Sequence, residues 1–141
     1  MCSPGTMAEF FIFDSSIVID QIRANLHTGR IQNIDGLIRN SSVVLAELWR
    51  GASSPVDWKT VRFFERNYPI LTPTEKNWIE SGHILAEIRD DHGFEMGKLR
   101  DLHFDVLIVL TARTNGARLI TSNRADFELI REYRNFKLEV W

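Results

Sequence analysis

The chain has 141 residues, of which 44% are hydrophobic and 26% are charged, and its formal net charge is −2. This length and composition are typical of one globular domain and exclude a disordered chain. The slightly negative charge argues against an architectural DNA-binding protein, and the single cysteine, Cys2, excludes an intrachain disulfide and a cysteine-based zinc site.

No stretch of the sequence reaches the length of a membrane span, and its first residues have neither the basic region nor the long apolar region of a signal peptide. We therefore expect a cytoplasmic protein that does not enter a membrane. Residues 1–7 are expected to form a flexible N-terminal extension, and residues 8–141 a single domain.

The first half of the chain predicts a strand followed by a helix. Residues 10–13 are wholly apolar and indicate a buried strand, and Asp14 with the two serines after it can cap a helix. That helix is expected to end near Gly29, because its apolar residues recur every three or four positions: Ile19, Ile22 and Leu26. Residues 30–40 allow two interpretations, a short helix or, at their end, a strand over residues 36–40.

Three further elements are expected before the middle of the chain. They are a helix over residues 43–50 capped by Ser41-Ser42, a helix opened by Pro55 that runs to about residue 68, and a short strand at residues 70–71.

The second half of the chain continues the alternation. A long helix capped by Thr72 or Thr74 runs to about residue 89, and a loop is expected between Gly93 and Gly97. The remaining elements are, in order, a helix over residues 102–114, a strand over 119–121, a helix over 125–133 and a strand over 137–140. The first of these is apolar nearly all round and should be central. The alternation predicts an α/β sandwich with a parallel sheet and helices on both faces.

Four acidic residues lie beside strongly hydrophobic segments, where a carboxylate costs free energy unless it is hydrogen-bonded, paired or metal-bound: Asp14, Glu47, Asp105 and Asp126. If the fold brings them together, their repulsion must be relieved by protonation or by a cation. Carboxylate oxygens are ligands that Mg²⁺ and Mn²⁺ prefer. The four acids therefore indicate a metal site suited to the cleavage of a phosphodiester.

Each acid also has a structural interpretation when it is taken alone. Asp14 can cap a helix, Glu47 can occupy an exposed position of an amphipathic helix, and Asp105 can act on the dipole at a helix N-terminus. Asp126 can lie in the first turn of a helix that Asn123 caps. However, Asp14 and the segment from Asn123 to Asp126 each follow a strand, and ligands of open α/β sheets bind outside the carboxyl ends of the strands.

Four segments in this order resemble the PIN domain family, and within it the VapC-type toxins of prokaryotic toxin–antitoxin pairs: FIFDSSIVID, SSVVLAELWRGA, FDVLIVLTAR and LITSNRADF. They contain the four acids in turn, and the resemblance extends from about Ala8 to Trp141. Two departures are Ser15, where many members have threonine or asparagine, and the bulky VLIVL after Asp105, where alanines are common. All four acids are nevertheless present.

The resemblance implies a PIN-like three-layer sandwich in which a central, mostly parallel sheet is flanked by helices. It also implies a Mg²⁺- or Mn²⁺-dependent ribonuclease, with the four acids as its catalytic and metal-binding residues. Ser15, Thr121 and Asn123 would support these acids, the last two by orienting Asp126. A cognate VapB-type antitoxin protein would hold the enzyme inactive.

Basic and aromatic residues indicate where RNA and protein partners would bind. Arg50, Arg113 and Arg124 lie beside the acidic motifs and are the expected contacts to RNA phosphates, with unpaired loops of structured RNA as the substrate class. Residues 56–68, VDWKTVRFFERNY, carry more aromatic surface than one buried stripe requires. They are either a thick core or a groove for an antitoxin helix or a dimer interface. We expect a homodimer.

Two other classes of function remain open from the sequence. One is a catalytically silent module of the same fold that binds nucleic acid or protein. The other is a different metal-dependent phosphate enzyme, such as a nuclease that acts on DNA. No glycine-rich nucleotide loop supports a kinase or an NTPase.

Overall fold

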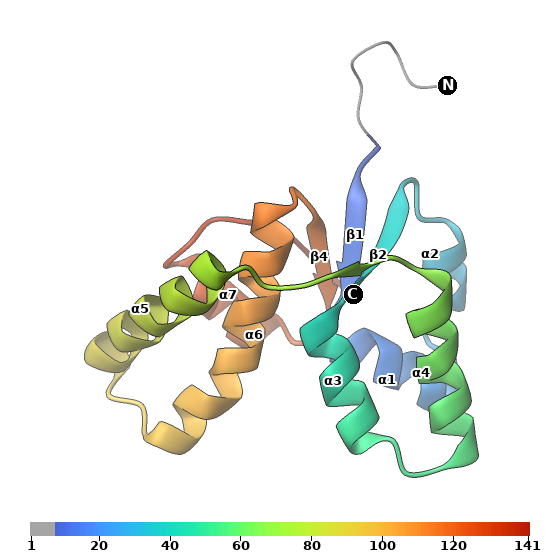
Figure 1. Ribbon diagram of the computed structural model, residues 1–141, viewed down its shortest axis with the longest axis horizontal. Coiled ribbons are helices and arrows are strands. Elements are labelled where there is room, and N and C mark those ends of the chain that lie inside the picture. The colour runs from blue at the N-terminus through green and yellow to red at the C-terminus, as the bar shows by residue number, and fades with distance from the viewer. Residues whose placement is uncertain (1–7) are drawn as a thin grey trace.

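The computed structural model describes residues 8–141, so the extension predicted for residues 1–7 lies outside the described residues. Strands and helices alternate along the chain (Figure 1). The strands are β1 (Phe10–Phe13), β2 (Leu37–Ser41), β3 (Ile70–Leu71), β4 (Arg118–Thr121) and β5 (Lys137–Val140). The helices are α1 (Ser15–Ala24), α2 (Thr28–Gln32), α3 (Ser42–Gly51), α4 (Pro55–Asn67), α5 (Glu75–His92), α6 (Met96–Thr114) and α7 (Arg124–Arg131).

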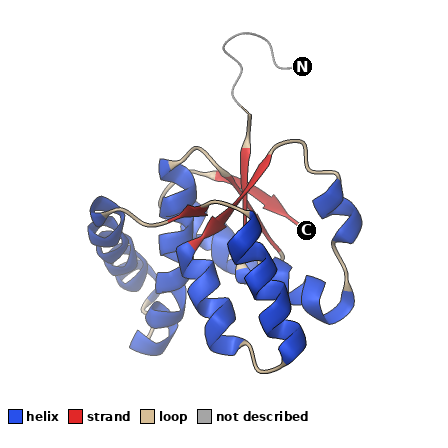
Figure 2. Cartoon of the chain, turned by 45° about the vertical axis from the view of Figure 1, so that its right-hand side comes forward, coloured by secondary structure: helices blue, strands red, loops and turns tan. Residues whose placement is uncertain are grey.

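The strands form one parallel sheet in the order β3-β2-β1-β4-β5, which confirms the predicted α/β class. The chain winds outward from β1 to β3 and then returns to place β4 on the other side of β1. This reversal makes the β1–β4 pair the switch point of the sheet, where ligands of such folds bind. Helices surround the strands of the sheet (Figure 2). Helices α1 to α4 are grouped beside β1 and β2, and α5 to α7 are grouped beside β4 (Figure 1).

Helix α6 is the centre of the core, as its apolar sequence predicted. Every residue from Val106 to Ala112 is buried, and the helix packs against α3, α5, α7 and β4. Contact on several sides explains why α6 has no polar face in this part, because each side of it must exclude water. No helix within residues 8–141 is long and apolar enough to cross a membrane.

Two helix boundaries differ from the prediction by more than three residues. Helix α6 begins at Met96, so Gly97 lies inside it and not at the end of a loop; the buried Leu99 extends the apolar stripe toward the N-terminus and outweighs the glycine. Helix α1 ends at Ala24, because Asn25 adopts a left-handed conformation with φ of 51°. Leu26 is consequently outside the helix and 64% exposed, so its place in the predicted apolar stripe was wrong.

Residues 30–40 contain the end of a short helix and then a strand, so both interpretations hold for part of the segment. Helix α2 ends at Gln32, and β2 begins at Leu37, whose backbone N–H donates to the Glu9 carbonyl at 2.9 Å. Gly36 lies at the start of this pairing. A Cβ atom there would overlap the Glu9 carbonyl oxygen and the Phe11 ring, so the close approach of β1 and β2 requires glycine.

Substitution of Gly36 by alanine should therefore destabilise the protein by about 1–3 kcal/mol, because the two strands must separate to admit the methyl group. Gly29→Ala is the matched control: Gly29 lies in α2 and a Cβ atom there has no neighbour within 4 Å. It should be neutral or stabilise by roughly 0.5–1 kcal/mol. Urea unfolding measures both variants, and equal stabilities would contradict the proposed close approach.

Candidate active site

Asp14 is fixed at the junction of β1 and α1. As the N-cap of α1 it accepts a hydrogen bond from the backbone N–H of Ile17 at 3.4 Å, which confirms the capping interpretation. Its own backbone N–H donates to the carbonyl of Ile120 in β4 at 3.0 Å and so extends the sheet. Burial raises the pKa of Asp14, and hydrogen bonds from Ser16 and Thr121 oppose that rise.

Two hydroxyl groups hold the carboxylate of Asp14. Ser16 Oγ donates to Oδ1 at 2.5 Å, and Thr121 Oγ1 donates to Oδ2 at 2.6 Å. The resemblance implied Ser15 for this role, but the Ser15 side chain makes no hydrogen bond within residues 8–141. Because α1 begins at Ser15, its first turn places Ser16 beside the end of β4, where Oγ also accepts from the backbone N–H of Ser122 at 3.0 Å. Thr121 thus supports Asp14 and not Asp126.

Glu47 lies in the middle of α3 and is half-buried. Burial raises its pKa and Asp14 adds to the rise, whereas the guanidinium of Arg50, one turn along the helix, opposes it. The Oε1 atom of Glu47 is buried and has no hydrogen-bond partner within residues 8–141. Such an atom is costly, so a solvated position on an amphipathic helix does not describe this residue.

Asp105 lies in the middle of α6, so its interpretation as a charge at a helix N-terminus was wrong. Burial raises its pKa to about 8, with further contributions from Glu47, Asp126 and Asp14, in that order. The ammonium of Lys98 opposes the rise. Because all three other acids act on Asp105, the fold brings the four carboxylates into one electrostatic environment.

Asp126 lies in the first turn of α7, as predicted, and both of its oxygens accept hydrogen bonds. Lys98 Nζ donates to Oδ1 at 3.0 Å, and Asn123 Nδ2 donates to Oδ2 at 3.1 Å. Asn123 is at the N-cap position, but its side chain does not cap the helix. Lys98 is the residue that sequence reasoning missed. Lys98 precedes Asp105 by two helical turns, so the two residues share one face of α6. The sequence could have indicated this only with a helix predicted to begin near Met96, whereas the predicted helix began at residue 102.

The donor chemistry of these residues fits a divalent cation. Within residues 8–141 no three acidic, histidine or cysteine side chains are close enough together to hold one ion as they stand. Within residues 8–141 one buried oxygen of Glu47 nevertheless has no hydrogen-bond partner, and burial together with three neighbouring acids raises the pKa of Asp105. A cation would favour the ionised form of both carboxyl groups. An all-oxygen donor set of this kind suits Mg²⁺ or Mn²⁺.

The three arginines expected to contact RNA lie at different distances from the acids. Arg50 has its guanidinium carbon 5.4 Å from the ring centre of Phe104, which precedes the acid of α6. Arg124 is exposed and lies 3.9 Å from Glu128. Arg113 lies in α6 about 12 Å beyond Asp105 along the helix axis. It lines a hollow together with residues at the start of α5. The structure therefore separates Arg113 from the acids.

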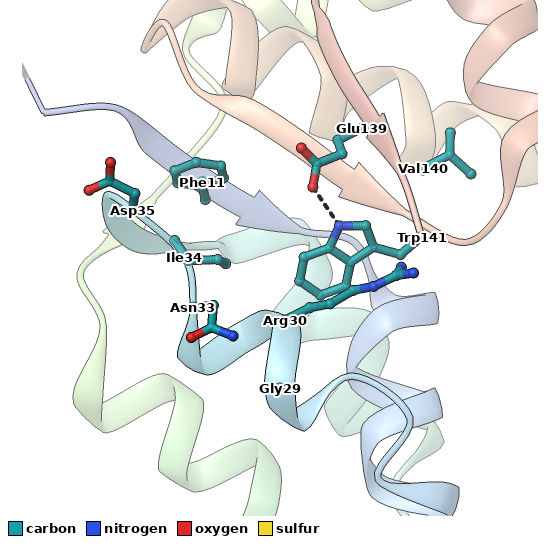
Figure 3. Close-up of a pocket in the computed structure, with 9 residues that line it drawn as sticks. All are labelled: Phe11, Gly29, Arg30, Asn33, Ile34, Asp35, Glu139, Val140 and Trp141. Carbon is teal, nitrogen blue, oxygen red and sulfur yellow. Dashed lines mark hydrogen bonds between the residues drawn. The ribbon is translucent and has the colours of Figure 1, made fainter.

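A larger hollow lies elsewhere on the molecule and contains none of the four acids (Figure 3). Its volume is about 730 Å³, and it lies between α2 and the end of β5. Trp141 forms one side of it, with its indole N–H donating to Glu139 at 2.5 Å and its ring 5.6 Å from the guanidinium carbon of Arg30. Trp141 also packs against Phe13 at the end of β1 and against His27 at the start of α2, so its contacts connect the C-terminal end of the chain to β1 and α2.

The model of the PIN domain family matches residues 11–133 of this chain. No curated protein shows a significant match. The fold is similar to solved structures of toxin–antitoxin complexes. For VapBC2 from Rickettsia felis bound to a DNA fragment from its promoter, the TM-score is 0.74 and the identity 24%, over 94% of this chain and 98% of that chain.

Two further structures show the same fold. DNA-bound VapBC from Salmonella typhimurium has a TM-score of 0.69 and 24% identity, over 96% of this chain and 99% of that chain. VapBC-5 from Mycobacterium tuberculosis, a member of the VapBC family of toxin–antitoxin systems, has a TM-score of 0.59 and 18% identity, over 93% and 96%. At these identities the likeness concerns the fold.

Without divalent ions, Asp105 should make the protein less stable as the pH rises. The unfolded carboxyl loses its proton near pH 4, roughly the value for a free side chain, whereas the folded one keeps it up to a pKa of about 8. Between these values the folded state binds the extra proton, so its stability falls as pH increases. The raised pKa values of Asp14 and Glu47 act in the same direction.

Thermal unfolding of the wild type and Asp105→Asn across this pH range measures the effect. The Tm of the variant should increase relative to that of the wild type as pH rises. Near pH 8 it should be higher by a few degrees, which is the shift that about 1 kcal/mol produces in a domain of this size. A constant difference between the two proteins would show that Asp105 ionises in the folded state as it does in the unfolded chain.

Proposed function

This chain belongs to the PIN domain family, and on that premise we propose that it is a metal-dependent ribonuclease, the toxin of a VapBC-type toxin–antitoxin pair. The observation that carries the proposal is that Glu47, Asp126 and Asp14 all raise the pKa of Asp105, with Asp14 held at the carboxyl ends of β1 and β4 by its bond to Thr121. The near-complete overlap of this chain with chains from two VapBC structures supports the toxin assignment.

We assign Asp14, Glu47, Asp105 and Asp126 as the residues that hold Mg²⁺ or Mn²⁺. Hydrogen bonds already fix both oxygens of Asp14 and of Asp126, so these two carboxylates are pre-oriented. Glu47 has a buried oxygen that forms no hydrogen bond with residues 8–141 and so has capacity for a further bond. When bound, the ion would neutralise the acids and activate a water molecule for attack on phosphorus.

The chain's own residues define how an RNA strand reaches this site. Phosphates are repelled by four carboxylates, so approach depends on the ion and on basic side chains at the rim, such as Arg50 and Lys98. The deep burial of Asp14 and Thr121 keeps water from competing for the hydrogen bond between them. Retention of this costly cluster favours an active enzyme over a silent binding module.

Asp105→Asn should reduce Mg²⁺- or Mn²⁺-dependent cleavage of total cellular RNA at least about a hundredfold, because it removes the carboxylate at the centre of the cluster. Asp101→Asn is the matched control. Asp101 is an exposed acid of the same helix, does not contribute to the pKa shift of Asp105, and should leave cleavage unchanged.

The same assay separates the alternatives. EDTA should abolish cleavage by the wild type. Cleavage of single-stranded DNA in preference to RNA would identify a DNA nuclease, and binding of RNA without turnover in either ion would identify a silent module. Equal activities of the Asp105 and Asp101 variants would contradict the assignment of the site.

The antitoxin is proposed to bind a groove of about 570 Å³ between α1, α2 and α4. The aromatic segment of α4 is divided between core and surface. Val61 and Phe64 are buried, so the core interpretation is correct for them, whereas Phe63 is 53% exposed and lines the groove. Together with the exposed Val56 it offers the apolar positions that an amphipathic helix requires. The homodimer would be an alternative use of the same surface.

Phe63→Ala should weaken binding of the antitoxin at least about tenfold, because it removes an exposed aromatic anchor at the groove. The toxin proposal predicts a short DNA-binding protein encoded immediately upstream of this chain; that protein is the partner for this test, and calorimetry measures its affinity. Ile79→Ala removes an exposed apolar side chain from α5, outside the groove, and is the control.

Thermal unfolding and light scattering complete that experiment. Phe63→Ala should keep the Tm of the wild type, since the side chain is outside the core. A large fall in Tm with unchanged affinity would place Phe63 in the core, and a change from dimer to monomer would assign the groove to a second copy of the chain.

A further inference from the structure

Lys98 is placed at the acidic site by the first turn of α6. It precedes Asp105 by two helical turns and therefore lies on the same face of the helix. Its Nζ atom donates to Asp126 at 3.0 Å and lies 6.0 Å from the ring centre of Phe94. Two neighbours thus hold this flexible side chain at one position.

The ammonium group of Lys98 has more hydrogen-bonding capacity than Asp126 uses. It has three N–H donors, and within residues 8–141 one of them is engaged, with Asp126 Oδ1. Its side chain is 40% exposed, so the remaining donors are accessible to a molecule at the rim of the site. The arrangement differs from a closed ion pair, in which both partners would be buried and saturated.

The other basic side chains near the acids are placed differently. Of the ion pairs formed within residues 8–141, the pair of Lys98 and Asp126 is the one that includes an acid of the site. Arg50 lies over an aromatic ring, Arg124 reaches toward Glu128, and Arg113 is near the far end of α6. Lys98 is therefore the cation that directly adjoins the carboxylates.

We propose that Lys98 binds a phosphate of the RNA strand beside the phosphodiester that is cleaved, an inference that rests on the ribonuclease function proposed above. A strand that approaches the acids needs positive charge on the side of entry, and a lysine acts as a point charge for phosphate oxygens. Lys98 supplies that charge next to Asp126, and its bond to Asp126 keeps it in place before RNA arrives.

The test is the salt dependence of RNA binding. The affinity of a short fluorescein-labelled single-stranded RNA is measured by fluorescence anisotropy at increasing NaCl, with Ca²⁺ in place of Mg²⁺ to slow cleavage. Lys98→Met should lower the affinity roughly tenfold at low salt. It should also reduce the slope of log affinity against log salt by about 0.7, the value for one phosphate contact to a single strand.

Two further variants and a second RNA make the result specific. Lys98→Arg keeps the charge and should retain most of the affinity. Lys76→Met removes an exposed lysine at the start of α5, beside Arg113, and should leave the slope unchanged. The loss caused by Lys98→Met should be equal for two RNAs of unrelated sequence, because a phosphate contact does not read bases.

The outcomes distinguish this inference from the function on which it rests. Wild-type protein that cleaves RNA, with a salt slope that Lys98→Met does not change, would overturn the inference alone; a lower Tm in that variant would then identify Lys98 as only the counter-ion of Asp126. Wild-type protein that neither binds nor cleaves RNA would overturn the ribonuclease proposal and this inference with it.

Discussion

Repulsion among carboxylates beside a hydrophobic core is the constraint on which the arrangement of this protein depends. Asp105 is followed in α6 by seven buried residues; burial, with further contributions from three other acids, raises its pKa to about 8. Holding these groups together costs free energy, and the packing of α6 against three helices and a strand is what opposes that cost. A surface helix could not hold an acid in this environment.

The parallel sheet determines where in the molecule the acids come together. Because β4 returns to the side of β1, Asp14 and Thr121 meet at the carboxyl ends of adjacent strands and form a buried hydrogen bond at 2.6 Å. The backbone N–H of Asp14 also donates a hydrogen bond to the carbonyl of Ile120 in β4, so Asp14 is held by both β1 and β4. The switch point thus provides a rigid base on which α3, α6 and α7 place the other three acids.

The polar contacts of the four acids are unequal, and this inequality has consequences for binding. Asp14 and Asp126 are fixed by donors on both oxygens, whereas Glu47 has a buried oxygen that has no partner in the part of the chain that the structure describes. The site is therefore partly pre-oriented and partly under-coordinated, which is the condition that favours uptake of a cation. Lys98 adds a positive charge at one edge of the site but leaves the interior acidic.

Local signals in the sequence determined the strands, most helix caps and the alternation that defines the α/β class. Ser41 caps α3 and Thr74 caps α5, as each short motif indicates, and the four acids were recognisable because each interrupts an apolar segment. The tertiary structure alone decided which groups meet. Ser16 and Thr121 lie 105 positions apart, and Lys98 and Asp126 are separated by 28. No periodic pattern encodes such pairs, because they arise only when the sheet and α6 pack together.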